Sequence, residues 1–532
     1  MTKNKYILLL LALIGFFSYS CKDDYNDHYD RSGDLPDENL YELMKSHPEL
    51  SSFVKLVEIG SYQDTLSTSQ TYTIWAPDND ALADIDLGTI SVTQARLIVG
   101  NHIARFNNPT STPDGKTIRM DNKKIYTYSS NGTMFSGVQI EGKNMRAKNG
   151  LLHTLKGQIP YHYNLYEYIK ATPETSKFKD FISLFDEEIF DPDASSTYID
   201  PETNQLMYDS VMIFYNRLFD DPVRGLGYIH EEDSIYTMLM PSDAAWDAAY
   251  TRISPSFVVY NANSHIADSI KNVQTSLAIV NDLIYRGYIA NPASQDSLRS
   301  TSPSIIYDPA DLFSGTVSES ASNGLVFKTD ELRYSNIETW NKPIEVEGET
   351  EDYRVAPTGN TSSYTTKSVA AGGDIFVSGL RYLEVNPTSP SVQPEVKIQI
   401  PNLLSGKYNI YVEFIPGSIE GAPNDSTRLQ YILTYRDARG SEKNELTLDK
   451  NLITSGTKKV KMKVFSEFNF PASNYYDRLW MIDLSNGIHT RADMKVNTSL
   501  KIQTNVTTAE YNNNIFTRNF RVDRIIFEPV VK

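Results

Sequence analysis

The chain has 532 residues, enough for roughly three to four domains of about 150 residues each. With 40% hydrophobic and 22% charged residues, its composition is that of an ordinary globular protein, which excludes a disordered or collagen-like chain. The 67 acidic residues exceed the 50 basic ones, and the resulting net charge of −17 disfavours nucleic acid as a partner.

The N-terminus has the pattern of a secretory signal peptide. Lys3 and Lys5 precede an apolar run over residues 6–17. As a helix this run would rise about 18 Å, which is too short to cross a hydrocarbon core of about 30 Å. We therefore predict that residues 1–20 are a signal peptide and that the remaining chain has no membrane span. Cys21, the only cysteine, follows this segment directly and excludes an internal disulfide framework.

This N-terminal segment resembles the signals of bacterial surface lipoproteins, in particular those of the Bacteroidota type, in which the cysteine after the signal is lipidated. The resemblance implies that Cys21 carries a lipid anchor, which would hold the protein at the outer membrane, facing the cell exterior. The alternative is an ordinary cleaved signal with an incidental cysteine. Residues 21–34 are polar and acidic, and we predict a flexible tether there in preference to a cation site.

Residues 35–163 are predicted to form a first domain of mixed α and β structure. Apolar residues recur at helical spacing after Asn39, after Pro48 and over residues 92–98. A β-branched and aromatic run over residues 71–75 predicts a strand. The later part of the domain alternates short strands with turns.

Three motifs of this domain resemble a fasciclin domain. Residues 72–82 (Tyr-Thr-Ile-Trp-Ala-Pro-Asp-Asn-Asp-Ala-Leu) are similar to the strand–turn–helix motif of that family. Residues 101–103 (Asn-His-Ile) are similar to its second motif, and residues 147–153 (Ala-Lys-Asn-Gly-Leu-Leu-His) to its closing strand. We expect Trp75 to pack inside the domain.

Residues 164–343 repeat this order of motifs. Asn-Leu-Tyr-Glu at 164–167 repeats the start of the first helix with an offset of 125 residues, and residues 236–246 repeat the strand–turn–helix motif. Ser-Asn-Gly-Leu-Val at 322–326 repeats the closing strand. The chain therefore resembles tandem fasciclin domains, the second more divergent and enlarged by an insertion at about residues 186–233.

Two features of these domains are candidates for metal binding or acid–base chemistry. His102 and His153 lack a second ligand at a suitable spacing, which favours hydrogen-bonded core histidines. Within the insertion, five oxygen-bearing residues have the spacing of an EF-hand calcium loop, but two prolines interrupt it and an acidic surface loop is favoured. These five residues are Asp191, Asp193, Ser195, Thr197 and Glu202.

Residues 344–532 are predicted to form an all-β domain. Apolar and polar residues alternate strictly in several runs, among them 396–400, 408–414, 429–435 and 460–464. Many short strands without a long helical pattern are typical of an antiparallel β-sandwich. The predicted fold is therefore multidomain, with two α+β domains followed by an all-β antiparallel sandwich.

Two strands of the third domain resemble the jelly rolls of galactose-binding-like carbohydrate-binding modules: residues 404–412 (Leu-Ser-Gly-Lys-Tyr-Asn-Ile-Tyr-Val) and 520–527 (Phe-Arg-Val-Asp-Arg-Ile-Ile-Phe). In such modules a sugar ring stacks on loop aromatics while nearby polar side chains bind its hydroxyls. The resemblance implies a ligand site within one segment; the alternative is that its aromatic rings are sandwich core. The candidate ligand-binding residues are Tyr475, Tyr476, Asp477, Arg478 and Trp480.

The sequence has none of the common catalytic motifs, such as a Gly-x-Ser-x-Gly elbow, a His-Glu-x-x-His helix or a phosphate loop. Carboxylates are plentiful, but nothing singles out a glycosidase pair. We therefore expect no enzyme activity, no cofactor and no metal. The resemblances imply a surface lipoprotein that binds polysaccharide or oligosaccharide as an accessory of a TonB-dependent uptake transporter. The alternative is adhesion or scaffolding, with the fasciclin domains binding other envelope or matrix proteins.

Overall fold

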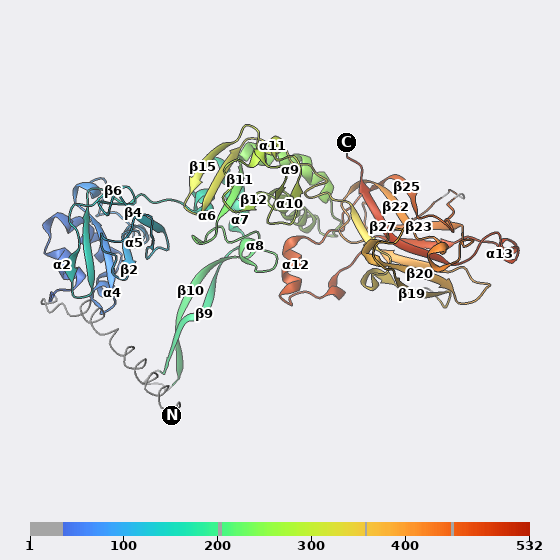
Figure 1. Cartoon of the computed structure of the whole chain (residues 1–532), viewed down its shortest axis with the longest axis horizontal. Coiled ribbons are helices and arrows are strands. Elements are labelled where there is room, and N and C mark those ends of the chain that lie inside the picture. Colours follow the sequence, from blue (N-terminus) through green and yellow to red (C-terminus); the bar gives the residue numbers. More distant parts are fainter. Residues whose placement is uncertain (1–35, 200–204, 357–358, 448, 450–451, 532) are drawn as a thin grey trace, which may run out of the picture. The chain divides into compact units, whose positions relative to one another are not determined.

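The computed structural model describes residues 36–199, 205–356, 359–447, 449 and 452–531 (Figure 1). The predicted signal peptide, the tether and the lipidated Cys21 lie outside the described residues. The chain divides into two compact units, one ending at His162 and the other beginning at Tyr163. Among the described residues, no helix combines the length and the apolar character that crossing a bilayer requires.

The first unit, called the first domain below, is built on a four-stranded sheet of order β2-β1-β8-β7. β1 (Tyr72–Pro77) is parallel to β8 (Gly150–Leu155) and antiparallel to β2 (Ile103–Arg105). A second sheet has the order β3-β4-β5-β6. The other elements are α2 (Leu40–Lys45), α3 (Ser51–Ile59), α4 (Gln63–Ser67), α5 (Val92–Gly100), β3 (Thr117–Arg119), β4 (Ile125–Ser129), β5 (Met134–Phe135), β6 (Val138–Gln139) and β7 (Met145–Ala147).

Aromatic rings fill a core between the two sheets of the first domain. Trp75 is fully buried and stacks on Phe135, with ring centroids 4.1 Å apart. Its indole N–H donates to the Tyr128 hydroxyl at 3.1 Å, so the polar end of the ring is satisfied. The expectation that Trp75 packs inside is confirmed.

The second unit begins with an α+β part, residues 163–343, called the middle domain below. Its sheet order, β12-β11-β16-β15, repeats that of the first domain. β11 (Tyr236–Pro241) is parallel to β16 (Gly324–Thr329) and antiparallel to β12 (Ile284–Arg286), so the sequence repeat is also a repeat of topology. The other elements are α6 (Leu165–Ala171), α7 (Ser176–Ser183), α8 (Arg217–Asp220), α9 (Asp243–Ile253), α10 (Ser264–Val280), α11 (Pro309–Leu312), β13 (Leu298–Arg299), β14 (Ile305–Ile306) and β15 (Val317–Ala321).

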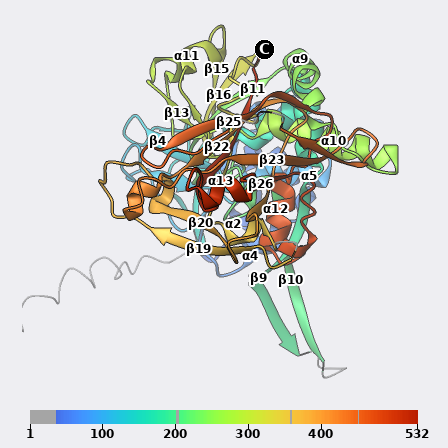
Figure 2. The same cartoon turned by 90° about the vertical axis from the view of Figure 1, so that its right-hand side faces the viewer.

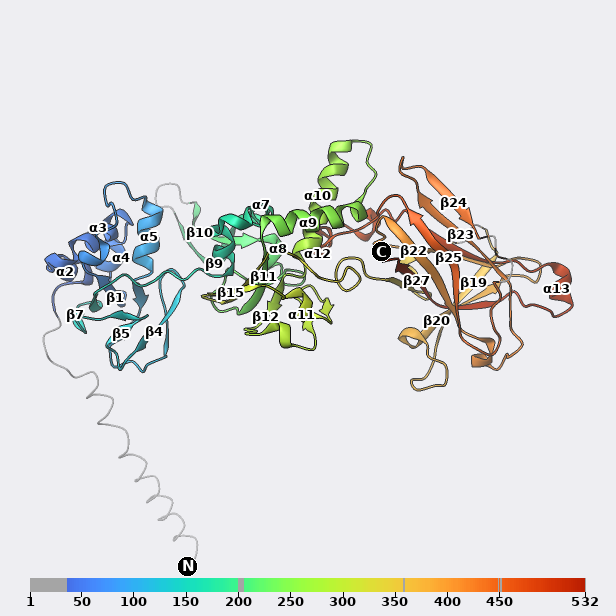
Figure 3. The same ribbon diagram turned by 90° about the horizontal axis from the view of Figure 1, so that it is seen from above.

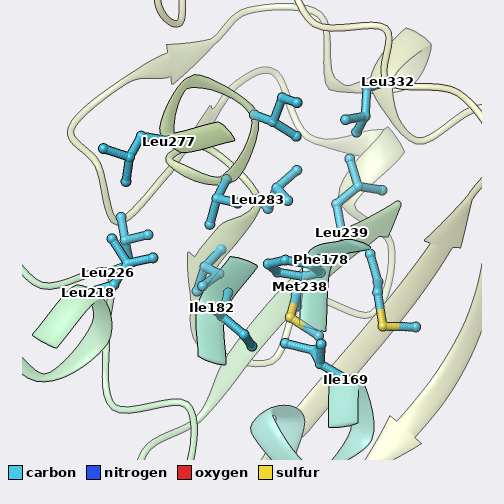
Figure 4. Close-up of a cluster of buried hydrophobic side chains, with 14 of the residues drawn as sticks. Ile169, Phe178, Ile182, Leu218, Leu226, Met238, Leu239, Leu277, Leu283 and Leu332 are labelled. Carbon is cyan, nitrogen blue, oxygen red and sulfur yellow. The ribbon is translucent and has the colours of Figure 1, made fainter. Parts of the chain in front are cut away.

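The core of the middle domain gathers apolar side chains from its helices and its central strand. Figure 4 shows Ile169, Phe178 and Met238 meeting in this core. Leu277 of α10 and Leu283, which follows that helix, complete another side of it. All five are buried, so packing accounts for the apolar faces of α6 and α7 and for that of the C-terminal half of α10.

The insertion of the middle domain contains a long hairpin of β9 (Asp186–Ile199) and β10 (Leu206–Asn216). Figures 1 and 2 both show this ribbon extending away from the rest of the domain. The expectation of an acidic surface loop at residues 191–202 is therefore wrong for its described part. Asp191 and Thr197 lie within an extended, paired strand, which cannot wrap its side chains around one ion as a calcium loop does.

Residues 344–531 form two antiparallel sheets, called the sandwich below (Figure 3). One has the order β19-β20-β27-β22-β25 with β17 also paired to β27, and the other β18-β21-β26-β23-β24. Their facing side chains form one buried core, so the alternating runs are confirmed as strands. The elements are β17 (Ile344–Glu347), β18 (Arg354–Val355), β19 (Ser362–Ser368), β20 (Arg381–Pro387), β21 (Glu395–Gln399), β22 (Gly406–Phe414), β23 (Leu429–Arg436), β24 (Glu442–Leu446), β25 (Val460–Phe470), α12 (Arg478–Ser485), β26 (Ser499–Thr504), α13 (Thr508–Asn512) and β27 (Phe520–Pro529).

Candidate functional site

Helix α12 connects β25 to β26 of the sandwich, but it packs into the middle domain. Leu479 and Ile482 are buried in the same core as the side chains of Figure 4. Asp477 caps the helix, because its carboxylate accepts the backbone N–H of Trp480 at 2.8 Å. The segment predicted to bind ligand is therefore also the main connection between these two parts of the second unit.

Two of the predicted site residues make contacts across this connection. The guanidinium of Arg478 donates to the side-chain oxygen of Asn281 at 3.0 Å and also to the Arg224 carbonyl. The ring of Tyr475 meets Phe257 edge-on, with centroids 5.5 Å apart. Burial raises the pKa of Tyr475 to about 12, so its hydroxyl stays neutral.

A hollow of about 340 Å³ lies beside these contacts, near the lower end of the range of about 300–1,000 Å³ that is usual for small-molecule sites. It is lined from both parts of the second unit. Four of the five predicted residues line it, and Arg478 does not. The lining residues that carry the argument are Tyr260, Ile270 and Gln274 from the middle domain and Arg436, Ser473, Asn474, Tyr476 and Trp480 from the sandwich.

Aromatic rings form one side of this pocket. Tyr476 meets Trp480 edge-on at 4.6 Å, and Trp480 stacks on His489 at 5.0 Å with an angle of 13° between the rings. Tyr260 is 46% exposed and lies against the turn at Gly440. A Cβ at residue 440 would come within 2.2 Å of the tyrosine ring, and the residue has φ +77°, so this close approach requires glycine.

Gln274 and Ser473 both line the pocket, and each has a buried side-chain oxygen, Oε1 and Oγ respectively, without a hydrogen-bond partner among the described residues. The amide N–H₂ of Gln274 donates to the Tyr475 carbonyl at 3.0 Å, which fixes the direction of its oxygen. A buried polar atom without a partner costs about 1–3 kcal/mol, so a ligand hydroxyl at this point would recover that energy.

The pocket carries no strong net charge. Arg436 and Asp477 are the two ionisable side chains of opposite sign in its lining, and burial raises the pKa of Asp477. Among the described residues, no cluster of three or more His, Cys, Asp or Glu side chains is arranged to hold a metal ion. Aromatic faces, amide groups and hydroxyls are the chemistry that this pocket offers a ligand.

Sequence reasoning missed the half of the pocket that comes from the middle domain. Tyr260 and Gln274 stand more than 190 residues before Trp480, and no local pattern links them. Arg436 is the last residue of β23, and the alternation of that strand predicts only its place in the sheet. The sequence signal that points to this half of the pocket is the helical pattern of Arg478–Ser485. Its two buried residues, Leu479 and Ile482, are covered by the core of the middle domain.

His102 and His153 of the first domain are core residues, as predicted. Nδ1 of His102 donates to the Ile98 carbonyl at 2.8 Å, and Nε2 accepts the Ile159 N–H at 3.0 Å. Nε2 of His153 donates to the Asn108 carbonyl at 3.2 Å. Burial lowers the pKa of both imidazoles to about 4, so both are neutral at pH 7. Both ring nitrogens of His102 are occupied by these hydrogen bonds.

Comparison with known proteins identifies one family by sequence. The fasciclin domain model matches residues 48–158. A comparison with curated proteins finds no match. The motifs at residues 72–82, 101–103 and 147–153 all lie inside the matched stretch.

Several solved structures are similar at low identity. A FAS1 domain pair of the insect cell adhesion molecule fasciclin I is 11% identical, with 55% of this chain and 99% of that chain covered and a TM-score of 0.20. The C-terminal family 22 carbohydrate-binding module of Clostridium thermocellum Xyn10B is 16% identical, with 36% and 96% covered and a TM-score of 0.21. The CBM22-1 xylan-binding domain of Paenibacillus barcinonensis Xyn10C is 12% identical, with 36% and 94% covered and a TM-score of 0.20. Likenesses at this level carry no information about ligands, so the function must be argued from the chain's own side chains. What the family comparison does establish is that residues 48–158 are a fasciclin domain.

Proposed function

We propose that this chain is a non-enzymatic glycan-binding protein and that the pocket beside Trp480 holds a sugar residue. The observation that carries the proposal is the pairing of aromatic rings with two buried, unsatisfied polar atoms, Gln274 Oε1 and Ser473 Oγ, in one hollow. A pyranose ring has an apolar C–H face that suits an aromatic ring, and its edge carries hydroxyls that donate and accept hydrogen bonds. The near balance of charge in the lining favours a neutral sugar.

In this proposal the rings of Tyr260 and Tyr476 contact the sugar, because both line the hollow and Tyr260 is 46% exposed. Asn474 contributes less, since its side chain is occupied: its oxygen accepts the Asn497 N–H at 2.6 Å and its amide donates to the Lys495 carbonyl at 3.2 Å. Asn474 thus shapes the pocket wall, and Gln274 supplies the free acceptor.

A titration of the full chain tests this proposal. A glycan array first selects a neutral oligosaccharide, and calorimetry then measures its affinity for the wild type, Tyr260→Ala and the matched control Tyr288→Ala. Tyr288 is an exposed tyrosine of the same domain that does not line the pocket. Loss of a stacking ring is expected to weaken binding by about tenfold in Tyr260→Ala only. Equal affinities for all three proteins, or the absence of any glycan ligand, would refute the proposal.

The cellular setting belongs to the same proposal. The lipoprotein-like signal supports attachment through Cys21 to the outer membrane, facing the exterior, where the protein serves a TonB-dependent transporter of glycans. The test is fractionation of cells that express Cys21→Ala, in which the protein is expected to leave the membrane fraction. An unchanged membrane fraction contradicts the anchor.

A second candidate function, adhesion or scaffolding, is favoured by the β9–β10 hairpin. Along β10, Met212, Ile213 and Phe214 are each between 37% and 50% exposed, which is unusual for consecutive apolar side chains. Replacement of all three by serine tests this candidate in a cell-aggregation assay. Reduced aggregation together with unchanged glycan affinity would favour adhesion, whereas unchanged aggregation would oppose it.

A further inference from the structure

The first domain contains a cationic hollow in a chain whose net charge is −17. The hollow measures about 560 Å³. Four cationic side chains, Arg105, Lys116, Arg119 and Lys123, and one carboxylate, Asp121, line it, for a net charge of +3. In a chain that otherwise repels anions, such a concave cationic patch concentrates positive potential at one point of the surface.

The strand pairing brings two of these cations together. Ala104 bridges Met120 in antiparallel fashion, and the Asp121 N–H donates to the Ile103 carbonyl. This register places Arg105 directly opposite Arg119, and side chains that are opposite each other in an antiparallel pair point to the same face. Two guanidinium groups on the same face can present their N–H donors to one anionic group.

An exposed aromatic ring stands at the edge of the same hollow. Phe106 has φ +68° and is 69% exposed. A bulky side chain in the left-handed region is strained, and an exposed ring gains little burial energy to offset the strain. Backbone strain of this kind concentrates where a side chain serves a ligand.

The repeat in the middle domain shows that the fold does not require this phenylalanine. The Phe106 carbonyl accepts the Thr73 hydroxyl at 2.7 Å, and the Gly287 carbonyl accepts the Thr237 hydroxyl at 2.9 Å. The two residues therefore occupy the same place in the two sheets. Gly287 has φ +88°, so glycine meets the backbone requirement there without strain.

The middle domain repeats the arginine pair but not the other features of the hollow. The Tyr285–Ser300 bridge places Arg286 opposite Arg299, as Arg105 lies opposite Arg119. Three residues before the second arginine of each pair, the first domain has Lys116 and the middle domain has Asp296. The extra positive charge and the aromatic ring are thus specific to the first domain.

We propose that this hollow binds an acidic oligosaccharide, with carboxylate or sulfate groups on the Arg105–Arg119 pair and a pyranose ring stacked on Phe106. Arginine presents a planar fork of donors that matches both anions. The exposed phenyl ring favours a saccharide over an acidic polypeptide, because a sugar offers both an anionic group and an apolar C–H face. This site lies in the first domain and is independent of the pocket beside Trp480.

Titrations of the full chain test the proposal with four probes: hexagalacturonate for uronate, a heparin hexasaccharide for sulfate, neutral maltohexaose and poly-glutamate. We expect one or both anionic saccharides to bind, and their affinity to fall as salt screens the cations. Phe106→Gly introduces the residue found in the repeat, so its melting temperature should equal or exceed that of the wild type. Its affinity for the anionic saccharide should fall by at least tenfold.

The double variant Arg105→Ala/Arg119→Ala should lose binding, and the matched double variant Arg286→Ala/Arg299→Ala should retain it. If the first pair fails to fold, Phe106→Gly alone decides the question. The proposal is overturned if neither anionic saccharide binds, if poly-glutamate binds as tightly as they do, or if Phe106→Gly retains full affinity.

Discussion

Asn149 joins three segments of the first domain through one buried amide. Its oxygen accepts the Leu40 N–H at 2.8 Å, and its N–H₂ group donates to the carbonyls of Leu66 and Thr68, both at 2.8 Å. In the middle domain Asn323 makes the corresponding bond to the Leu165 N–H at 2.8 Å. The Asn-Gly pairs that mark the repeat in the sequence are therefore anchors between the closing strand and the first helix.

The glycine that follows each of these asparagines allows the backbone of the neighbouring strand to approach closely. A Cβ at residue 150 would lie 1.9 Å from the Tyr72 carbonyl oxygen, which belongs to the backbone of β1. We expect Gly150→Ala to lower the melting transition of the first domain strongly, because β8 must move away from β1. The control is Gly137→Ala, at φ +77° with open space around its Cβ, which should cost only about 1 kcal/mol. Equal shifts of the two variants in calorimetry would contradict this account.

Buried histidines give the first domain a defined pH dependence. His102 is neutral in the fold with its pKa lowered to about 4 by burial, whereas in the unfolded chain its pKa is about 6.5. The unfolded state therefore takes up a proton first, and stability is lost as the pH falls from about 6.5 towards 4, by about 3 kcal/mol for this residue. NMR of the imidazole protons of His102 measures the midpoint directly. A midpoint near 6.5 in the folded protein would contradict the burial argument.

A sequence pattern can indicate a capping residue without indicating which N–H group that residue binds. Asn79 and Asp80, in the motif at residues 72–82, are residue types that commonly cap helices. In the structure Asp78 accepts the Ala81 N–H at 2.9 Å, while Asn79 accepts the Ser52 N–H of the distant helix α3 at 2.9 Å. The chemistry of capping was predictable, but its partner was not, because tertiary packing decides which N–H groups a side chain reaches.

Helix α12 is the element that links the sandwich to the core of the middle domain. It is a helix of eight residues that contributes Leu479 and Ile482 to the core of the middle domain. Ile482→Ala should lower the stability of the middle domain by about 2–5 kcal/mol, since it leaves a cavity in that core. The control is Ile488→Ala in the same segment, where the side chain is 64% exposed and little change is expected. An Ile482→Ala protein that melts like the control would contradict the docking of α12.

Strands were predictable from sequence where one face is buried and one is solvated. The run at residues 429–435 alternates in sequence, and its burial alternates from Leu429 to Leu433; in β21 (Glu395–Gln399) burial alternates throughout. The hairpin β9–β10 was not predicted, because its apolar residues at 211–214 are consecutive and its partner strand carries Pro192. Its pairing depends on the register between two strands, and the sequence of either strand alone does not reveal that register.

At the scale of the whole molecule, three sequence domains correspond to two compact units. The second unit holds the middle domain and the sandwich together, because α12 and Leu404 enter the core of the middle domain. The change in amino-acid composition near residue 344 indicates a domain boundary. Composition carries no information about which segment of the sandwich returns to pack on the middle domain. Four predicted site residues therefore line the pocket, but the lining residues that the middle domain contributes were not predicted.

A fragment comparison tests this unity. Isolated residues 344–532 should expose Leu479 and Ile482, so a protease should cut the segment around α12 quickly. Residues 163–532 should protect it and retain glycan affinity, because Tyr260 and Gln274 are then present. Equal protection of α12 in both fragments would show that the middle domain is not its partner.

We propose that a sugar occupies the pocket between α10 and the residues that precede α12. A crystal structure of the second unit with the oligosaccharide selected by the glycan array tests it most directly. We expect a sugar ring against Tyr260 or Tyr476, with hydroxyls bonded to Gln274 Oε1 and Ser473 Oγ. A sugar bound on either outer sheet face of the sandwich, with this pocket filled by water, would contradict it.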